Sequence, residues 1–129
     1  MNSTAATRRR PIGRLVYSSL AALLLAAIAL EVAKHGTGHW QLAAFGLGPD
    51  LALLAGAGSG LRKGQLHPRA VPLYNLVHRY WGPLALAAAA SFGLLSLGFF
   101  VGALAWGLHV SLDRALGYGL RTRDGFQRA

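Results

Sequence analysis

Apolar residues along this chain fall into four long runs that are separated by short polar or glycine-containing breaks. Each run approaches the length of about 20 residues that a helix needs to cross a bilayer. We therefore predict four membrane-spanning helices, at about residues 15–33, 41–61, 71–94 and 97–120. Because the break between the last two runs is short and contains glycine, we expect these two helices to form an antiparallel hairpin.

The composition agrees with an all-α integral membrane bundle. Hydrophobic residues make up 53% of the 129 residues and charged residues only 13%, a balance typical of membrane proteins. The net charge of +9 would also suit a nucleic-acid-binding protein. The basic residues lie between the apolar runs instead of forming one patch, so we expect a lipid bilayer as the partner and no nucleic acid. The absence of cysteine excludes disulfides and thiolate metal sites.

The positions of the basic residues predict the orientation in the membrane. They concentrate in the N-terminal tail, in the loop between the second and third runs, and after the fourth run. Cytoplasmic loops carry such an excess of Lys and Arg, so we expect a multi-pass protein of the bacterial inner membrane with both termini in the cytoplasm. Residues 1–13 would be a basic cytoplasmic tail, 14–120 the transmembrane domain and 121–129 a second tail. Within these tails, residues 1–10 and 124–129 are expected to be disordered.

Several polar residues lie inside the apolar runs, where a charged side chain costs about 2.5–3.5 kcal/mol even on a lenient insertion scale. At a rise of about 1.5 Å per residue, the positions of Asp50, His78, His109 and Asp113 share the cytoplasmic half of the bilayer. His109 and Asp113 are also four residues apart, on one helix face. Pro49 is expected to kink the second helix beside Asp50. We predict that these four polar side chains converge in one buried cluster.

Two imidazoles and two carboxylates form a ligand set that suits one zinc-like divalent ion. We therefore predict a metal site formed by Asp50, His78, His109 and Asp113, in a metal-dependent membrane hydrolase acting on lipid-like substrates. Four further residues are expected to hydrogen-bond a ligand or contact the substrate: Asn75, Arg79, Arg114 and Tyr118. Of these, Arg79 or Arg114 could receive an anionic headgroup.

Two other functions stay open at this point. In the first, the polar cluster stabilises a non-enzymatic, homo-oligomeric bundle, or provides a path for ions or protons. Asp113 would then pair with Arg79 or Arg114. In the second, His78 and His109 bind a haem between them, although the two carboxylates would then lie unexplained beside an apolar macrocycle.

Three motifs resemble one known family. They are Pro49-Asp50-Leu51, then Tyr74-Asn75-Leu76-Val77-His78 with Pro83, and finally His109-x-x-x-Asp113-Arg114-x-x-Gly117-Tyr118-Gly119-Leu120, followed by Arg121 and Phe126. Over about residues 14–126 the chain is similar to domain-of-unknown-function family 4260. The resemblance implies a small bacterial membrane protein and names no activity.

Overall fold

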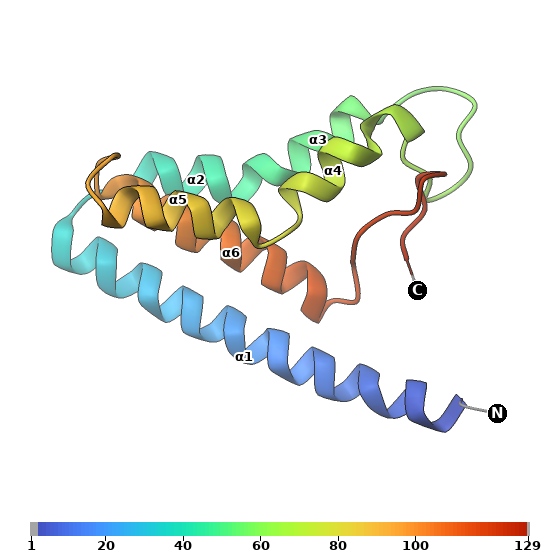
Figure 1. The fold of residues 1–129 in the computed structure, drawn as a ribbon, viewed down its shortest axis with the longest axis horizontal. Helices are drawn as coiled ribbons and strands as arrows, with labels where there is room; N and C mark the ends of the chain where they lie inside the picture. The colour runs from blue at the N-terminus through green and yellow to red at the C-terminus, as the bar shows by residue number, and fades with distance from the viewer. Residues whose placement is uncertain (1–2, 129) are drawn as a thin grey trace.

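The computed structural model describes residues 3–128, with side chains described from residue 11 onward. In this part of the chain the protein is all-helical (Figure 1). The only β-type pairing in it is an isolated bridge between Arg121 and Gln127. In chain order the elements, with η for a 3₁₀ helix, are α1 (Ser3–His35), α2 (His39–Leu47), η1 (Gly48–Asp50), α3 (Leu51–Ala55), η2 (Pro68–Ala70), α4 (Val71–Val77), α5 (Trp81–Ser91) and α6 (Gly98–Ala115).

The long helix α1 covers the first predicted run and extends beyond it at both ends. Its sequence is rich in Ala and Leu, which are strong helix formers. Lys34 and His35 occupy its last turn, where positive charge complements the helix dipole. The helix stops at Gly36, whose φ of 61° is the left-handed conformation that terminates many helices. Since α1 begins at Ser3, the expectation of a disordered tail over residues 1–10 is wrong from Ser3 onward.

The second and third predicted runs are present, but each is broken into shorter helices. As expected, the second bends at Pro49, where η1 separates α2 from α3. The third was predicted as one helix and instead breaks at residues 78–80, between α4 and α5. Pro83 explains the break, because its ring would clash with the carbonyl of Arg79 in a continuous helix and it has no N–H to donate.

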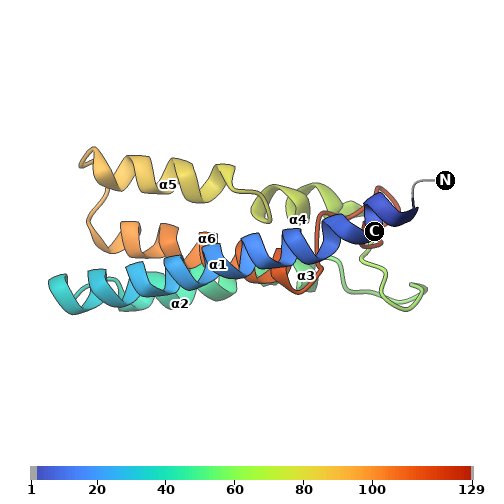
Figure 2. The ribbon, with the colours of Figure 1, turned by 90° about the horizontal axis from the view of Figure 1, so that it is seen from below.

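Helix α6 lies at the centre of the molecule, with α1 on one side and α2 and α5 on others (Figures 1 and 2). Val101 and Ala105 of α6 pack against Ile28 of α1 to form the main core. Close approach to α2 depends on glycine: a Cβ on Gly102 would lie 2.7 Å from a ring carbon of Phe45. The predicted hairpin is confirmed, since α5 and α6 are joined by a short turn and pack together.

The outer surface is strongly apolar. Large side chains such as Leu54, Trp81 and Phe92 are 72–83% exposed, and exposed leucines also line α1. Among the described residues, one helix is by itself long and apolar enough to cross a membrane, the Pro11–His35 part of α1. Only 11% of its most apolar stretch is buried in the molecule, unlike the core helix of a soluble protein.

The C-terminal segment folds back onto the bundle, which contradicts the expectation of a disordered tail for residues 124–128. The backbone of Gly125 accepts a hydrogen bond from Leu66 N at 2.8 Å. The side chain of Gln127 accepts one from Gly119 N at 2.9 Å. The polar composition suggested a tail, but Leu66, which is distant in sequence, pairs with the backbone of this segment. Residue 129 lies outside the described residues.

Candidate metal centre

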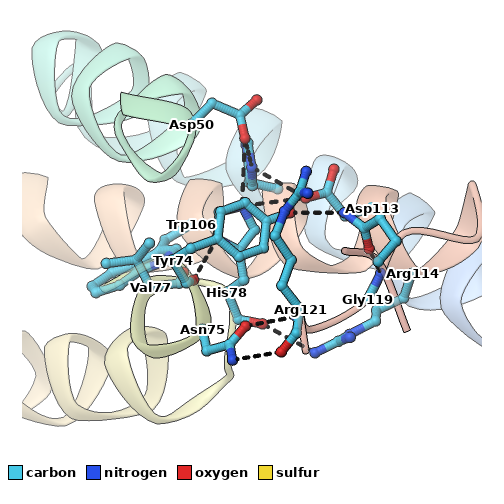
Figure 3. Close-up of polar contacts among 12 residues, drawn as sticks. Asp50, Tyr74, Asn75, Val77, His78, Trp106, Asp113, Arg114, Gly119 and Arg121 are labelled. Atoms are coloured by element: carbon cyan, nitrogen blue, oxygen red, sulfur yellow. Dashed lines mark hydrogen bonds and ion pairs between the residues drawn. The ribbon is translucent and has the colours of Figure 1, made fainter. Parts of the chain in front are cut away.

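The four predicted ligands converge as predicted, although the cluster is not fully buried, because Asp50 is exposed. Asp50 comes from the η1 turn, His78 from the break after α4, and His109 and Asp113 from one face of α6. One potential ligand atom from each residue lies within 4.8 Å of all the others. Figure 3 shows Asp50, His78 and Asp113 directed toward one another from three elements. The i, i+4 spacing on α6 and the two helix breaks therefore create a single site.

The distances between the potential ligand atoms suit an ion with tetrahedral coordination. His109 Nε2 lies 3.1 Å from an oxygen of Asp50 and 3.5 Å from one of Asp113. His78 Nε2 lies 3.4 Å from the same oxygen of each carboxylate. A tetrahedral zinc site with metal–ligand distances of about 2.0–2.1 Å has ligand–ligand edges of about 3.3–3.4 Å. The four measured separations fall around this value.

Both imidazoles are oriented by their second nitrogen. His78 Nδ1 lies 2.8 Å from the carbonyl oxygen of Tyr74, and His109 Nδ1 lies 2.8 Å from that of Gly46. A carbonyl only accepts, so each Nδ1 carries the proton and donates it. Each Nε2 then faces the two carboxylates, and in a neutral ring it presents a lone pair to them. Metal-binding histidines are oriented in this way, and such an array needs a cation, either a metal ion or added protons.

The helix breaks that form the site are stabilised by side chains of α6. Trp106 Nε1 donates to the carbonyl of Val77 at 2.7 Å, and Arg114 donates to the carbonyl of His78 at 3.1 Å. The Gly46 carbonyl, before the η1 turn, receives its bond from His109. Backbone groups left by a broken helix need such partners in an apolar setting. Helix α6 therefore both supplies ligands and fixes the bent segments that carry the others.

The His78 ring stacks on the ring of Tyr74, which in turn contacts the guanidinium of Arg121. The Tyr74 ring stacks on His78 with centroids 3.9 Å apart and planes 15° apart. The guanidinium of Arg121 lies 4.9 Å from the Tyr74 ring centroid, within the range of a cation–π contact. Sequence reasoning missed this layer, because only the family motifs included Tyr74 and Arg121. Both lie close to the site in Figure 3.

Of the four residues predicted around the metal, Arg114 hydrogen-bonds a predicted ligand residue, and the others lie as follows. The side chain of Asn75 forms its hydrogen bonds with the backbone of Arg121: it donates to the carbonyl at 3.0 Å and accepts from the N–H at 2.8 Å. Its structural role is thus to attach the C-terminal segment. Arg114 supports the His78 carbonyl, whereas Arg79 is exposed. Tyr118 is 52% exposed and lines a cavity beside Arg114.

Two details bear on the alternative functions. Among the described residues Asp113 forms ion-pair contacts with the two histidines and with no arginine, so the predicted pairing with Arg79 or Arg114 is not found. Haem ligation does not fit this arrangement. Asp50 and Asp113 each lie within 3.5 Å of both Nε2 atoms and occupy the space that a macrocycle between the rings would need.

The cluster is accessible from the side of Asp50. The Asp50 side chain is 51% exposed, whereas that of His78 is only 3% exposed. A cavity of about 200 Å³ lies near the cluster: its lining includes Pro49 and Val77, each next in the chain to a cluster residue, but none of the four cluster residues themselves. The remainder of its lining is apolar or glycine: Ala44, Phe45, Gly48 and Trp106. The cavity could therefore hold an apolar group close to the cluster.

Fold and site together define an all-helical protein with a two-histidine, two-aspartate cluster between bent helical segments. A family model described as "Domain of unknown function (DUF4260)" matches residues 15–129. The chain belongs to this family, which confirms the resemblance seen in its motifs. The comparisons matched no curated protein and no solved structure.

Proposed function

We propose that this protein is a membrane-embedded, divalent-metal-dependent hydrolase that acts on lipid-like substrates. The observation that carries the proposal is the convergence of two oriented Nε2 atoms and two carboxylates at tetrahedral edge distances. Together the two carboxylates bring a charge of −2, which one divalent cation would neutralise. A bound divalent ion would supply Lewis-acid chemistry for hydrolysis.

The surroundings of the cluster support a lipid-like substrate. Asp50 is half-exposed, and an apolar cavity is lined by Pro49 and Val77, the chain neighbours of Asp50 and His78. An ester with an apolar chain could place that chain in the cavity and its polar bond beside the cluster. The reaction class would be ester hydrolysis, in which water adds across the ester bond and releases an acid and an alcohol.

Metal titration combined with an activity assay tests this proposal. The extensively washed protein should hold, or take up on titration with Zn²⁺, one ion per chain. It should also release fatty acid or headgroup from phospholipid vesicles, and a chelator should stop this release. Stoichiometric metal without hydrolysis would reject the enzyme while keeping the metal site. The absence of both would favour the structural interpretation, in which protonated histidines form ion pairs with the carboxylates.

The same proposal includes four membrane-spanning segments with both termini in the cytoplasm. Its support is the apolar outer surface and the positions of the basic residues, which follow the positive-inside rule. The two bent segments would cross as broken helices whose carbonyls are satisfied by α6. A homo-oligomer is compatible with this placement.

Reporter fusions test the topology. A reporter placed after residue 129 and one inserted within residues 36–39 should lie on opposite sides of the membrane, because the second, third and fourth membrane segments lie between them. A fusion after residue 63, in the basic loop, serves as a control and should match the C-terminal fusion. If the fusions at 36–39 and 129 lie on the same side, the four-segment topology is wrong.

A further inference from the structure

A second cavity, distinct from the apolar one lined by Pro49 and Val77, lies beyond the end of α6 and is lined in part by Arg114 and Arg128. Its volume is about 310 Å³, and its lining comprises Arg114, Gly117, Tyr118, Gly119, Leu120 and Arg128. Arg14 of α1 reaches the same turn, since a Cβ on Gly117 would lie 3.6 Å from Arg14 Nη2. Three guanidinium groups from separate parts of the chain therefore gather at one turn.

The positive charge at this turn is not compensated within the described residues. Asp113, the carboxylate nearest to Arg114 in sequence, makes its ion-pair contacts with the two histidines of the cluster. Asp124, the side-chain carboxylate nearest to Arg128 in sequence, takes part in none of the ion pairs among the described residues. Glu31 pairs with His35 at 3.3 Å. The ion pairs of this part of the chain include none between an arginine and a carboxylate. Arginine presents planar, multiple donors that suit phosphate oxygens, so the chemistry of the pocket favours a phosphate group.

An apolar groove continues from the arginine pocket. It has a volume of about 430 Å³ and lies between α1 and α6, with the lining Ser18, Ala21, Ala22, Leu25, Leu108, Leu112, Ala115 and Leu116. Leu116 lines the groove and the next residue, Gly117, lines the pocket. On α1, Arg14 and Ser18 are one helical turn apart and therefore lie on one face. The pocket and the groove therefore lie next to each other where α6 ends, and Arg14 of α1 is close to both.

We propose that this pocket and groove bind one anionic phospholipid. Its phosphate would lie beside Arg14, Arg114 and Arg128, and an acyl chain would follow the groove between α1 and α6. The turn at Gly117 shapes the pocket: Gly117 has a φ of 92°, and Tyr118 N bonds back to the Asp113 carbonyl at 2.8 Å. This inference uses the proposed membrane placement and is independent of the proposed metal chemistry.

Native mass spectrometry of the full chain with equimolar phosphatidylglycerol and phosphatidylcholine tests the headgroup site. The wild-type protein should retain phosphatidylglycerol preferentially. Arg14→Gln and Arg128→Gln should each lower its retention about fivefold, corresponding to about 1 kcal/mol per arginine near a membrane surface. Arg123→Gln is the matched control, since Arg123 is exposed and lines neither chamber. An equal loss in the control, or no preference in the wild type, would overturn the proposal.

A second pair of variants separates a lipid from a free phosphate. Ala22→Phe should fill the groove and lower phosphatidylglycerol retention, whereas Ala26→Phe, at an exposed α1 position outside the groove, should not. Excess inorganic phosphate should displace the lipid only weakly. If phosphate competes fully and Ala22→Phe has no effect, the site binds phosphate alone and the lipid proposal fails. Zinc content measured on the same samples shows whether the metal centre is intact, so the two proposals can fail separately.

Discussion

Replacing His109 with alanine is expected to remove the divalent metal from the protein. His109 Nε2 lies 3.1 Å from Asp50, and its Nδ1 is held by the Gly46 carbonyl at 2.8 Å. Loss of a group that merely orients a ligand costs about 10–100-fold in metal affinity. Loss of the ligand itself should cost at least about 100-fold by the same measure. Zinc content after extensive washing, together with titration of the stripped protein, provides the measurement.

Two companion variants make the result specific. Asp50→Asn keeps the shape of a largely exposed side chain but removes its charge, so it should also weaken metal binding without disturbing the fold. His39→Ala removes an exposed histidine outside the cluster and should leave zinc content unchanged. Helical content by circular dichroism shows whether each variant folds. If wild-type protein neither carries nor acquires stoichiometric metal, the metal site is rejected and the cluster is a set of ion pairs.

Gly102→Leu is expected to destabilise the bundle and weaken the metal centre at the same time. A Cβ at this position would lie 2.7 Å from Phe45 and 3.2 Å from Gln41 Cβ, both on α2. Overpacking of this kind typically costs about 1–3 kcal/mol. Separation of α2 from α6 would also move the η1 turn, and with it Asp50, away from His109. Thermal unfolding in detergent and zinc titration should therefore both show a loss.

The matched control is Gly13→Leu on α1. A Cβ at Gly13 would meet nothing within 4 Å, so the larger side chain should change neither stability nor metal affinity by more than a small amount. Equal destabilisation by both variants would mean that added apolar volume, not the α2–α6 contact, is responsible. Unchanged zinc affinity in Gly102→Leu would show that the position of Asp50 does not depend on this contact.

The cluster could be predicted from sequence because strong constraints act on it. A buried carboxylate in an apolar run needs a partner, and His109 and Asp113 share a helix face through their spacing. The bend beside Asp50 could be predicted from Pro49, since proline interrupts a helix wherever it occurs in the interior. These are local rules, and they were sufficient to bring four residues from three segments to one site.

The details that sequence did not predict depend on partners distant in the chain. Asn75 was assigned to the cluster by its spacing from His78, yet its amide pairs with the backbone of Arg121, and no local pattern reveals a backbone partner. The break at residues 78–80 could have been found from Pro83. The predicted span instead joined the apolar residues on the two sides of His78-Arg79-Tyr80 into one run. The C-terminal segment was interpreted as a tail because its residues are polar, but it is attached through backbone hydrogen bonds to Leu66 and to the Asn75 side chain.

The dependence of both bent segments on α6 has a consequence for biogenesis. Trp106, His109 and Arg114, which satisfy the carbonyls at the two breaks, belong to α6, which leaves the ribosome after both bent segments. In the proposed membrane placement, the second and third segments would therefore enter the bilayer with open backbone carbonyls, an arrangement that is costly in hydrocarbon. Their stable insertion has to await the synthesis of α6. Any chain that terminates before α6 would remain incompletely inserted and become a substrate for membrane quality control.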